Sequence, residues 1–429
     1  MGKPEIAVIG GGIAGMIAAL EVARLGGSPT LYEATPKLGG RAQTRELEGF
    51  YLNQGPHALY LAGALCAALA DFDVKVSGRG PDLPNGLAVW SGAAHPFPLR
   101  RTGRSHDPLD AADSQALAAF FTDMANDAHL GVGVSLREAL NGLPARAAMV
   151  IAALVRLSTY VDGLDEIDGK AALDQLRLSF AGTIYVDGGW RTLVEGLTLR
   201  TSQAGVTIKT GDRVSSLNRA DDGSIRVEAR SGSVRTFSAA ILAVPPHAAQ
   251  KMLPTSQNLT AAVAATCPVR LMSLDLALSQ LPNPEATFAL GFDEPTYLSV
   301  HSDRAALAPT GGALVHVAHY LRPGEQANPD LFARIEGMAD SLQPGWRSAV
   351  VHEQRLSGAT VAFDFPRFEN GGTRAKVTLT DSPGVYLAGD WVGDTGMLAD
   401  AAAASAYCAA RSAYRFCCDG SSTTSESGT

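Results

Sequence analysis

The sequence predicts an α/β protein in which a Rossmann-like nucleotide-binding domain is interrupted twice by a mixed α+β domain. Three observations lead to this fold class. A glycine-rich turn joins an apolar strand to a helix near the N-terminus. Segments that alternate strand and helix in the same way return near residues 186 and 355. The stretches between them have other patterns, mainly helical in the first and extended in the second.

The first unit has the order of a dinucleotide-binding fold. The apolar run at residues 6–9 suits a strand buried on both faces. The spacing G-x-G-x-x-G follows, formed by Gly10, Gly12 and Gly15. It allows a tight turn, close approach of a pyrophosphate and close packing of a helix, which we expect at residues 13–25. A strand at 30–33 ends in Glu33, whose carboxylate can bind a ribose diol. This unit therefore favours NAD or FAD over NADP, and a glycine-rich turn without a ligand is the alternative.

The remaining elements divide between two domains. The segments assigned to the nucleotide-binding domain are 1–75, 186–250 and 355–418. Those assigned to the substrate domain are 76–185 and 251–354. A short polar tail, 419–429, has the small polar composition of a disordered segment.

Composition narrows the class of protein. A net charge of −8 argues against nucleic-acid binding. Five cysteines without a C-x-x-C spacing suit a reducing cytosol, so we expect a cytoplasmic protein without a signal peptide or membrane span. The apolar segment 145–157 is interpreted as a core helix, and a helix lying on a membrane surface is the alternative. Peripheral membrane contact therefore stays open.

Four motifs carry a family resemblance. "GGGIAG" is followed by "LGGRAQT" at 38–44, "NQGPHALY" at 53–60 and "LAGDWVGDTGML" at 387–398. In this order they resemble the flavin amine oxidase and phytoene desaturase superfamily, and "GPH" is closer to the phytoene dehydrogenase-like side. The resemblance implies an FAD-dependent oxidoreductase, and it covers the nucleotide-binding segments better than the substrate domain.

The resemblance also implies which residues bind the cofactor. The pyrophosphate would pack on Gly10, Gly12, Ala14 and Gly15. The adenosine would meet Glu33 through its ribose and Val214 through its adenine. The phosphates and the flavin would pass beside Gly39, Gly40 and Arg41. The ribityl or phosphate region would be held by Gly389 and Asp390. The isoalloxazine would be lined by Gly55, Pro56 and His57, and its pyrimidine ring would face the helix that begins at Met397 and Leu398. A helix N-terminus there favours the negative charge of a reduced flavin.

The substrate site departs from the amine oxidase pattern. Amine oxidases of this superfamily carry a lysine in the strand after the Pro-Pro segment, where this chain has "CPVRLMSLDLAL" with Arg270 and no lysine. We predict that Arg270 points away from the flavin or serves an anionic or neutral substrate. The candidate pocket residues are Tyr60, Arg270, Tyr297, His301, His316, Tyr320 and Trp391. No metal site is expected, because the histidines of "HVAH" would point to opposite faces of a strand. The catalytic residues stay unknown.

The sequence therefore predicts an FAD enzyme that oxidises or desaturates a largely apolar small molecule by hydride transfer to flavin N5. Oxidation of an amine or amino acid is the second hypothesis. A redox-neutral isomerase, or a flavoprotein without catalysis, is the third. The substrate, the oligomeric state and the electron acceptor, whether oxygen, a quinone or NAD(P), stay open.

Overall fold

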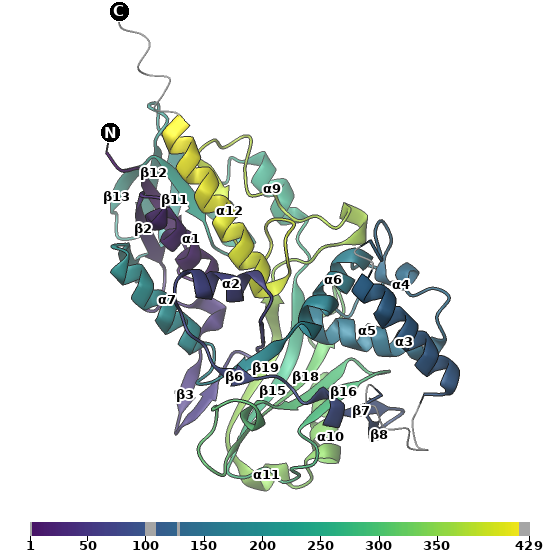
Figure 1. Ribbon diagram of the computed structural model, residues 1–429. Coiled ribbons are helices and arrows are strands. Elements are labelled where there is room, and N and C mark those ends of the chain that lie inside the picture. Colours follow the sequence, from purple (N-terminus) through teal and green to yellow (C-terminus); the bar gives the residue numbers. More distant parts are fainter. Residues whose placement is uncertain (1, 99–108, 127–128, 420–429) are drawn as a thin grey trace, which may run out of the picture.

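A computed structural model describes residues 2–98, 109–126 and 129–419 of the chain. The chain forms two halves, one built on a parallel sheet and one on a mixed sheet (Figure 1). Together they confirm the predicted fold class. Residues 420–429, nearly all of the tail for which we predict disorder, lie outside the described residues.

Five parallel strands form the central sheet of the nucleotide-binding half, in the order β10-β2-β1-β14-β20. Their bounds are β1 Glu5–Ile9, β2 Ser28–Glu33, β10 Thr207–Thr210, β14 Ala239–Leu242 and β20 Val385–Leu387. These strands come from all three segments assigned to this domain. The sheet is therefore assembled from distant parts of the chain, and the carboxyl ends of its strands meet at one edge.

Both faces of the parallel sheet are covered. Ile6 and Val8 of β1 pack on one face against helices α1 Ile13–Arg24, α2 Ala64–Asp71, α7 Arg191–Gln203 and α12 Leu398–Asp419. Ala7 and Ile9 pack on the other face, because successive side chains of a strand alternate. That face is covered by the antiparallel strands β11 Val214–Arg219, β12 Ile225–Ala229 and β13 Val234–Phe237, with α8 Pro246–Met252 and α9 Gln257–Ala264. This explains the uninterrupted apolar run at residues 6–9.

The second half is built on a seven-stranded sheet with the order β19-β15-β18-β17-β16-β7-β8. Its strands are β7 Leu87–Trp90, β8 Ala93–Pro96, β15 Val269–Leu278, β16 Phe288–Gly291, β17 Thr296–Val300, β18 Ala313–Leu321 and β19 Val350–Ala362. Neighbouring strands are antiparallel except β16 and β7. β19 runs across the boundary that we predict between residues 354 and 355, and the domain boundaries themselves stay predictions.

Helices cover this sheet on both sides as well. One apolar cluster joins its strands to α10 Asp330–Leu342 and α11 Trp346–Ala349. The other joins them to the helices α3 Ala111–Asn126, α4 Leu136–Ala139, α5 Ala145–Thr159 and α6 Gly169–Phe180. The helix expected at 145–157 is α5, and its Val150, Ile151 and Leu154 are buried in this cluster. Among the described residues, no helix is long and apolar enough to cross a membrane.

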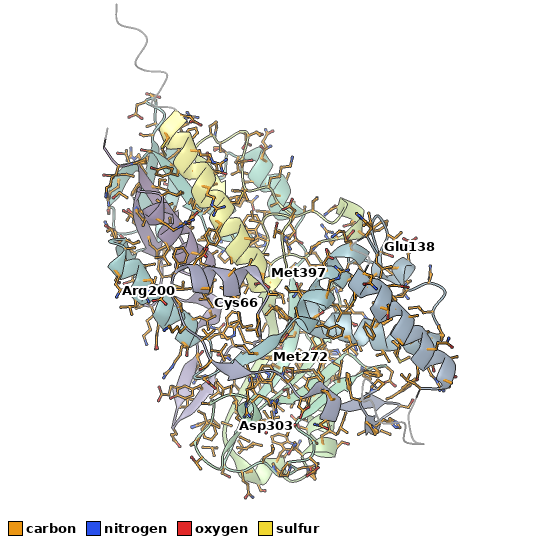
Figure 2. The ribbon with its side chains drawn as sticks, viewed as in Figure 1. Cys66, Glu138, Arg200, Met272, Asp303 and Met397 are labelled. Carbon is orange, nitrogen blue, oxygen red and sulfur yellow. The ribbon has the colours of Figure 1, made fainter. Side chains whose placement is uncertain are left out.

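Short elements connect the two halves. They are β3 Arg45–Leu47, β4 Phe50–Leu52, β5 Leu59–Tyr60, β6 Gly78–Arg79 and β9 Thr183–Val186. Met397, at the start of α12, lies where the halves meet (Figure 2). Its side chain and that of Leu398 pack in the apolar cluster formed with α3, α4, α5 and α6, whereas the buried alanines of α12 pack on the parallel sheet. The entry to α12 is therefore a junction between the two domains.

Candidate functional site

A cavity of about 740 Å³ runs between the two halves, a volume usual for small-molecule sites. The predicted cofactor-binding residues that line it are Gly10, Gly12, Ala14, Glu33, Gly39, Gly40, Arg41, Pro56, His57, Val214, Gly389, Asp390 and Leu398. Three others, Gly15, Gly55 and Met397, lie behind the wall next to lining residues. Tyr60 and Trp391 also line the cavity. The structure thus gathers motifs from both ends of the chain around one space.

The three glycines of the first turn differ in what they contact. A Cβ atom at Gly15 would lie 1.7 Å from the Gly10 carbonyl oxygen, and one at Gly10 would lie 2.2 Å from the Ala243 carbonyl oxygen. Packing of the fold alone therefore requires these two glycines. A Cβ at Gly12 would meet nothing within 4 Å. Gly12 borders the cavity at the start of α1, so the open space before it is a cradle that a phosphate can fill.

Glu33 and Val214 both line the cavity, and β11 begins shortly after Thr210, which pairs with Glu33 at the carboxyl end of β2. One Glu33 carboxylate oxygen accepts a hydrogen bond from the Gly11 amide at 2.8 Å. The other accepts from the amide and the hydroxyl of Thr35, both at 2.8 Å. Glu33 is therefore fixed beside the glycine turn. We call this region the Glu33 end.

An ion pair forms another part of the cavity wall. The Arg41 guanidinium lies 2.7 Å from one Asp390 oxygen and donates a second bond to the Val361 carbonyl at 2.7 Å. It also lies 4.5 Å from the centre of the Phe363 ring. The other Asp390 oxygen, Oδ1, is buried and has no hydrogen-bond partner among the described residues. A buried acceptor without a donor fits a ligand hydroxyl at this position.

The start of α12 forms another part of the wall. Leu398 adopts a left-handed conformation with φ of 55°, which is rare for leucine and turns the chain into the helix. Asp400, two residues later, accepts a hydrogen bond from the Leu65 amide at 2.8 Å. Burial raises the pKa of Asp400 to about 6. Asp400 closely follows the "GML" of the last motif, but it is not among the cofactor-binding residues that the sequence predicts.

The opposite end of the cavity, which we call the His57 end, is formed by both domains. Pro56 and His57 meet Tyr160, Leu271 and Leu356 there. A Cβ at Gly55 would lie 3.5 Å from Leu356 and 3.9 Å from Leu271. The His57 end therefore touches β15 and β19 of the seven-stranded sheet. Sequence patterns gave no signal for the two leucines, because they reach the cavity only through tertiary packing.

His57 is held in one orientation. Its Nδ1 lies 3.0 Å from the Gly55 carbonyl oxygen, which can only accept, so Nδ1 carries the proton. The imidazole packs edge-on against Trp190, with ring centres 4.8 Å apart. Burial lowers the pKa of His57 to about 4, against the opposing effect of the Gly55 carbonyl. The side chain is therefore neutral at physiological pH.

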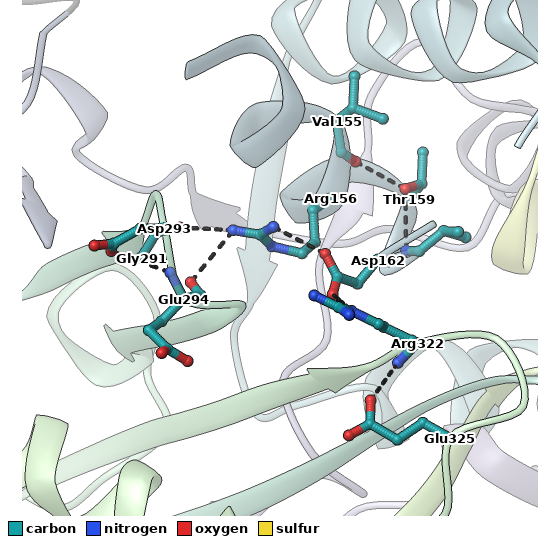
Figure 3. Close-up of polar contacts among 10 residues, drawn as sticks. Val155, Arg156, Thr159, Asp162, Gly291, Asp293, Glu294, Arg322 and Glu325 are labelled. Carbon is teal, nitrogen blue, oxygen red and sulfur yellow. Dashed lines mark hydrogen bonds and ion pairs between the residues drawn. The ribbon is translucent and has the colours of Figure 1, made fainter. Parts of the chain in front are cut away.

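Tyr160 contacts the segment that contains Pro56 and His57. The sequence does not predict this residue as part of the site. Tyr160 follows α5 in a left-handed conformation with φ of 63°, and its hydroxyl donates to the Pro56 carbonyl at 3.0 Å. The end of α5 is anchored by Arg156, which donates to Asp162 at 3.0 Å and to the Gly291 carbonyl at 2.7 Å (Figure 3). These contacts connect the end of α5 to the seven-stranded sheet. They also hold Tyr160 in the cavity wall.

The other predicted pocket residues lie outside the cavity wall. They are Arg270, Tyr297, His301, His316 and Tyr320. Arg270 donates to the Glu325 carbonyl at 2.6 Å. Tyr320 packs edge-on against Tyr160, with ring centres 5.8 Å apart.

A buried polar cluster contains the remaining three. His316 Nδ1 donates to Asp275 at 2.7 Å, and His301 Nε2 lies 3.0 Å from the Tyr297 hydroxyl. Gln354 donates to Asp275 at 2.8 Å and to the Asn53 carbonyl at 2.9 Å, which joins the cluster to the "NQGPHALY" segment. In the described part of the chain, no group of three or more histidine, cysteine or acidic side chains is arranged to hold a metal ion.

The interrupted parallel sheet and the glycine-lined cavity define a two-domain dinucleotide-binding protein. The chain belongs to the flavin-containing amine oxidoreductase family, whose sequence model matches residues 13–272. As a member of this flavin-containing family, the protein is an FAD-dependent enzyme, as the resemblance implied. The open space at Gly12 and the unpartnered Asp390 oxygen fit this cofactor.

Three similar proteins illustrate the relationship. Carotenoid phi-ring synthase of Streptomyces griseus is 32% identical over 184 residues, which are 41% of this chain and 31% of that protein. The 4,4'-diapolycopen-4-al dehydrogenase of Metabacillus indicus is 37% identical over 71 residues, 17% of this chain and 14% of the relative. The chain thus matches less than a third of the length of these curated relatives. The crystal structure of an oxidoreductase from Methanosarcina mazei has a TM-score of 0.75 at 18% identity and covers 94% of this chain and 98% of its own. This last likeness shows the fold.

Proposed function

We propose that this enzyme oxidises or desaturates a largely apolar small molecule. Bound FAD supplies the hydride acceptor, at its N5 position. The protein binds the substrate, orients it and excludes water. When a saturated bond becomes a double bond, the substrate loses a hydride from one carbon and a proton from its neighbour.

The observation that carries this proposal is the composition of the wall that the seven-stranded sheet contributes. The lining residues from β15 and β19 are Leu271, Leu356, Ala359, Thr360 and Val361, and none of them is charged. This part of the wall therefore offers no carboxylate to pair with a protonated amine. A charged amine would lose its hydration there without compensation, whereas an apolar molecule is stabilised by burial.

The lining residues of the cavity also favour an apolar substrate over an amine. Among the described lining residues there is no lysine, and Arg270 is occupied with the Glu325 carbonyl. Two relatives point in the same direction, since carotenoid phi-ring synthase and 4,4'-diapolycopen-4-al dehydrogenase are named for carotenoid chemistry. Amine oxidation stays the second candidate, because the family as a whole is named for it.

The proposal includes the way in which FAD lies in the cavity. Its pyrophosphate faces Gly12 and the amides that begin α1. Its adenosine occupies the Glu33 end, beside Val214. Arg41 and Asp390 flank its middle, and the start of α12 faces the pyrimidine ring. The isoalloxazine then borders the His57 end, where the uncharged wall of the seven-stranded sheet begins.

Anaerobic mixing of the oxidised holoenzyme with a panel of terpenoids and amines tests this proposal. We expect at least one apolar terpenoid to bleach the flavin absorbance, while primary amines and amino acids leave it unchanged. Rapid bleaching by an amine, with ammonia release, would place amine oxidation first. Terpenoid conversion without bleaching would indicate a redox-neutral isomerase.

A further inference from the structure

His57 presents an unused hydrogen-bond acceptor at the His57 end of the cavity. Its Nδ1 proton is committed to the Gly55 carbonyl, so Nε2 of the neutral ring carries a lone pair. The structure gives Nε2 no partner in the part of the chain that it describes, and the residue lines the cavity. The Gly55 carbonyl and the edge of Trp190 hold the ring in this orientation, and Tyr160 fixes the neighbouring Pro56 carbonyl.

We propose that His57 Nε2 accepts a hydrogen bond from a hydroxyl group of the substrate. The inference rests on the proposed function and narrows it to an otherwise apolar molecule that carries one alcohol. One hydroxyl group satisfies the acceptor at Nε2. The apolar remainder of the ligand can then pack against Leu271 and Leu356, which line the same cavity.

The surroundings of His57 select a neutral donor over an ammonium group. Positive charge at this ring is disfavoured first by burial and then by His316 and Arg41, while the Gly55 carbonyl and Asp275 oppose these effects. The Asp275 carboxylate is already bound by His316, by Ser273 at 2.5 Å and by Gln354. The same environment that keeps the imidazole uncharged therefore penalises a cation placed against Nε2. An alcohol supplies the donor without charge.

A pair of probes that differ only in the donor tests this role. Farnesol carries a hydroxyl, and farnesyl methyl ether has nearly the same shape without a donor. Each is titrated into oxidised holoenzyme, and binding is followed by the change in the flavin absorption spectrum. We expect farnesol to bind about two- to tenfold more tightly, the range of one net hydrogen bond. Equal dissociation constants in the wild type would overturn the inference.

Variants of His57 identify the acceptor. His57→Phe removes it and should make the two dissociation constants equal. His57→Gln places a carbonyl oxygen near the position of Nε2 and should restore part of the preference, whereas His57→Asn, which reaches only as far as Nδ1, should not. His247→Phe is the matched control, because His247 is exposed on α8 and does not line the cavity. It should retain the wild-type ratio.

Three other outcomes separate the possible failures. If neither probe changes the spectrum, the apolar substrate class of the proposed function is wrong, and the inference is wrong with it. If both bind but His57→Phe keeps the preference for farnesol, only the inference fails. Loss of FAD from the His57 variants would assign Nε2 to the cofactor and would also contradict it. FAD content is measured from the absorbance released on denaturation.

Discussion

Arg41 and Asp390 form an ion pair of 2.7 Å, although one follows the second strand of the parallel sheet and the other follows its last strand. The Asp390 side chain is 4% exposed and that of Arg41 is 40% exposed. Asp390 is therefore the partner that would be left as a buried, unpaired charge if the ion pair were broken. The pair joins the first and the third segments of the nucleotide-binding domain across the cavity.

Replacing Arg41 by Gln should destabilise the protein. The Asp390 carboxylate would then lack its cation while staying buried, and we expect a loss of about 1–3 kcal/mol in the free energy of unfolding. Chemical denaturation measures this loss. Arg45→Gln is the control, since Arg45 is exposed and, within the described residues, its side chain makes only a hydrogen bond of 3.5 Å with Gln354. Equal stability of the two variants would show that the pair contributes nothing.

Gly12→Ala should separate folding from cofactor binding. Its methyl group would enter open space, so the apoprotein should unfold at the same denaturant concentration as the wild type. FAD affinity should fall at least about tenfold, because the methyl group occupies the cradle that we assign to the pyrophosphate. Gly337→Ala, on α10, also meets nothing within 4 Å and should leave FAD binding intact. Stoichiometric FAD in the Gly12→Ala variant would refute the assignment.

Glu33→Gln tests the Glu33 end. Charge-assisted hydrogen bonds contribute roughly 1.5–3 kcal/mol, so the dissociation constant of FAD should rise at least about tenfold. The side-chain amide group that replaces the carboxylate would also face donors at Gly11 or Thr35, and the apoprotein should lose some stability. Both quantities are measured, by FAD titration and by denaturation. A stability loss with unchanged FAD affinity would mean that Glu33 only supports the glycine turn.

The first unit could be predicted closely because its determinants are local. The helix expected at 13–25 is α1, Ile13–Arg24, and the strand expected at 30–33 is β2, Ser28–Glu33. Glycine spacing and apolar runs act over a few residues, and the contacts of Gly10 and Gly15 explain two of the three glycines. The FAD cofactor could be predicted because motifs far apart in the chain match one family pattern.

The substrate side could not be predicted in the same way. Tyr160 reaches the cavity through a left-handed turn after α5, which no local pattern of tyrosine predicts. His316 was a pocket candidate, but both faces of β18 are buried between layers, and its side chain turns to Asp275 instead. Without a polar and an apolar face, the strand gives no signal for which side chains meet the cavity. The roles of these residues stay proposals.

Asp364 predicts a pH dependence of stability. It is buried just after β19, accepts a hydrogen bond from the Cys267 amide, and burial raises its pKa to about 6 from an ordinary 3.8. Because the folded state holds the proton more tightly than the unfolded state, its contribution to stability is lost as pH rises from about 4 to about 6. Arg367 and Arg374 oppose the shift without cancelling it.

Asp364→Asn removes that ionisation. At about pH 8 the variant should be more stable than the wild type by up to about 3 kcal/mol, and at about pH 4 the two should be similar. Denaturation at both pH values measures the difference. Asp221→Asn, at an exposed position, should show no such change. A stability difference for Asp364→Asn that is the same at both pH values would rule out this account.

The most direct test of the central claim is a single anaerobic turnover with product analysis. Oxidised holoenzyme is mixed with one equivalent of an apolar terpenoid that bleaches the flavin, and the product is analysed by mass spectrometry while ammonia is assayed in parallel. The account predicts a product lighter by two hydrogen atoms, formed in proportion to the bleached flavin, with no ammonia. Bleaching by amines alone, with ammonia formed in the same proportion, would contradict it.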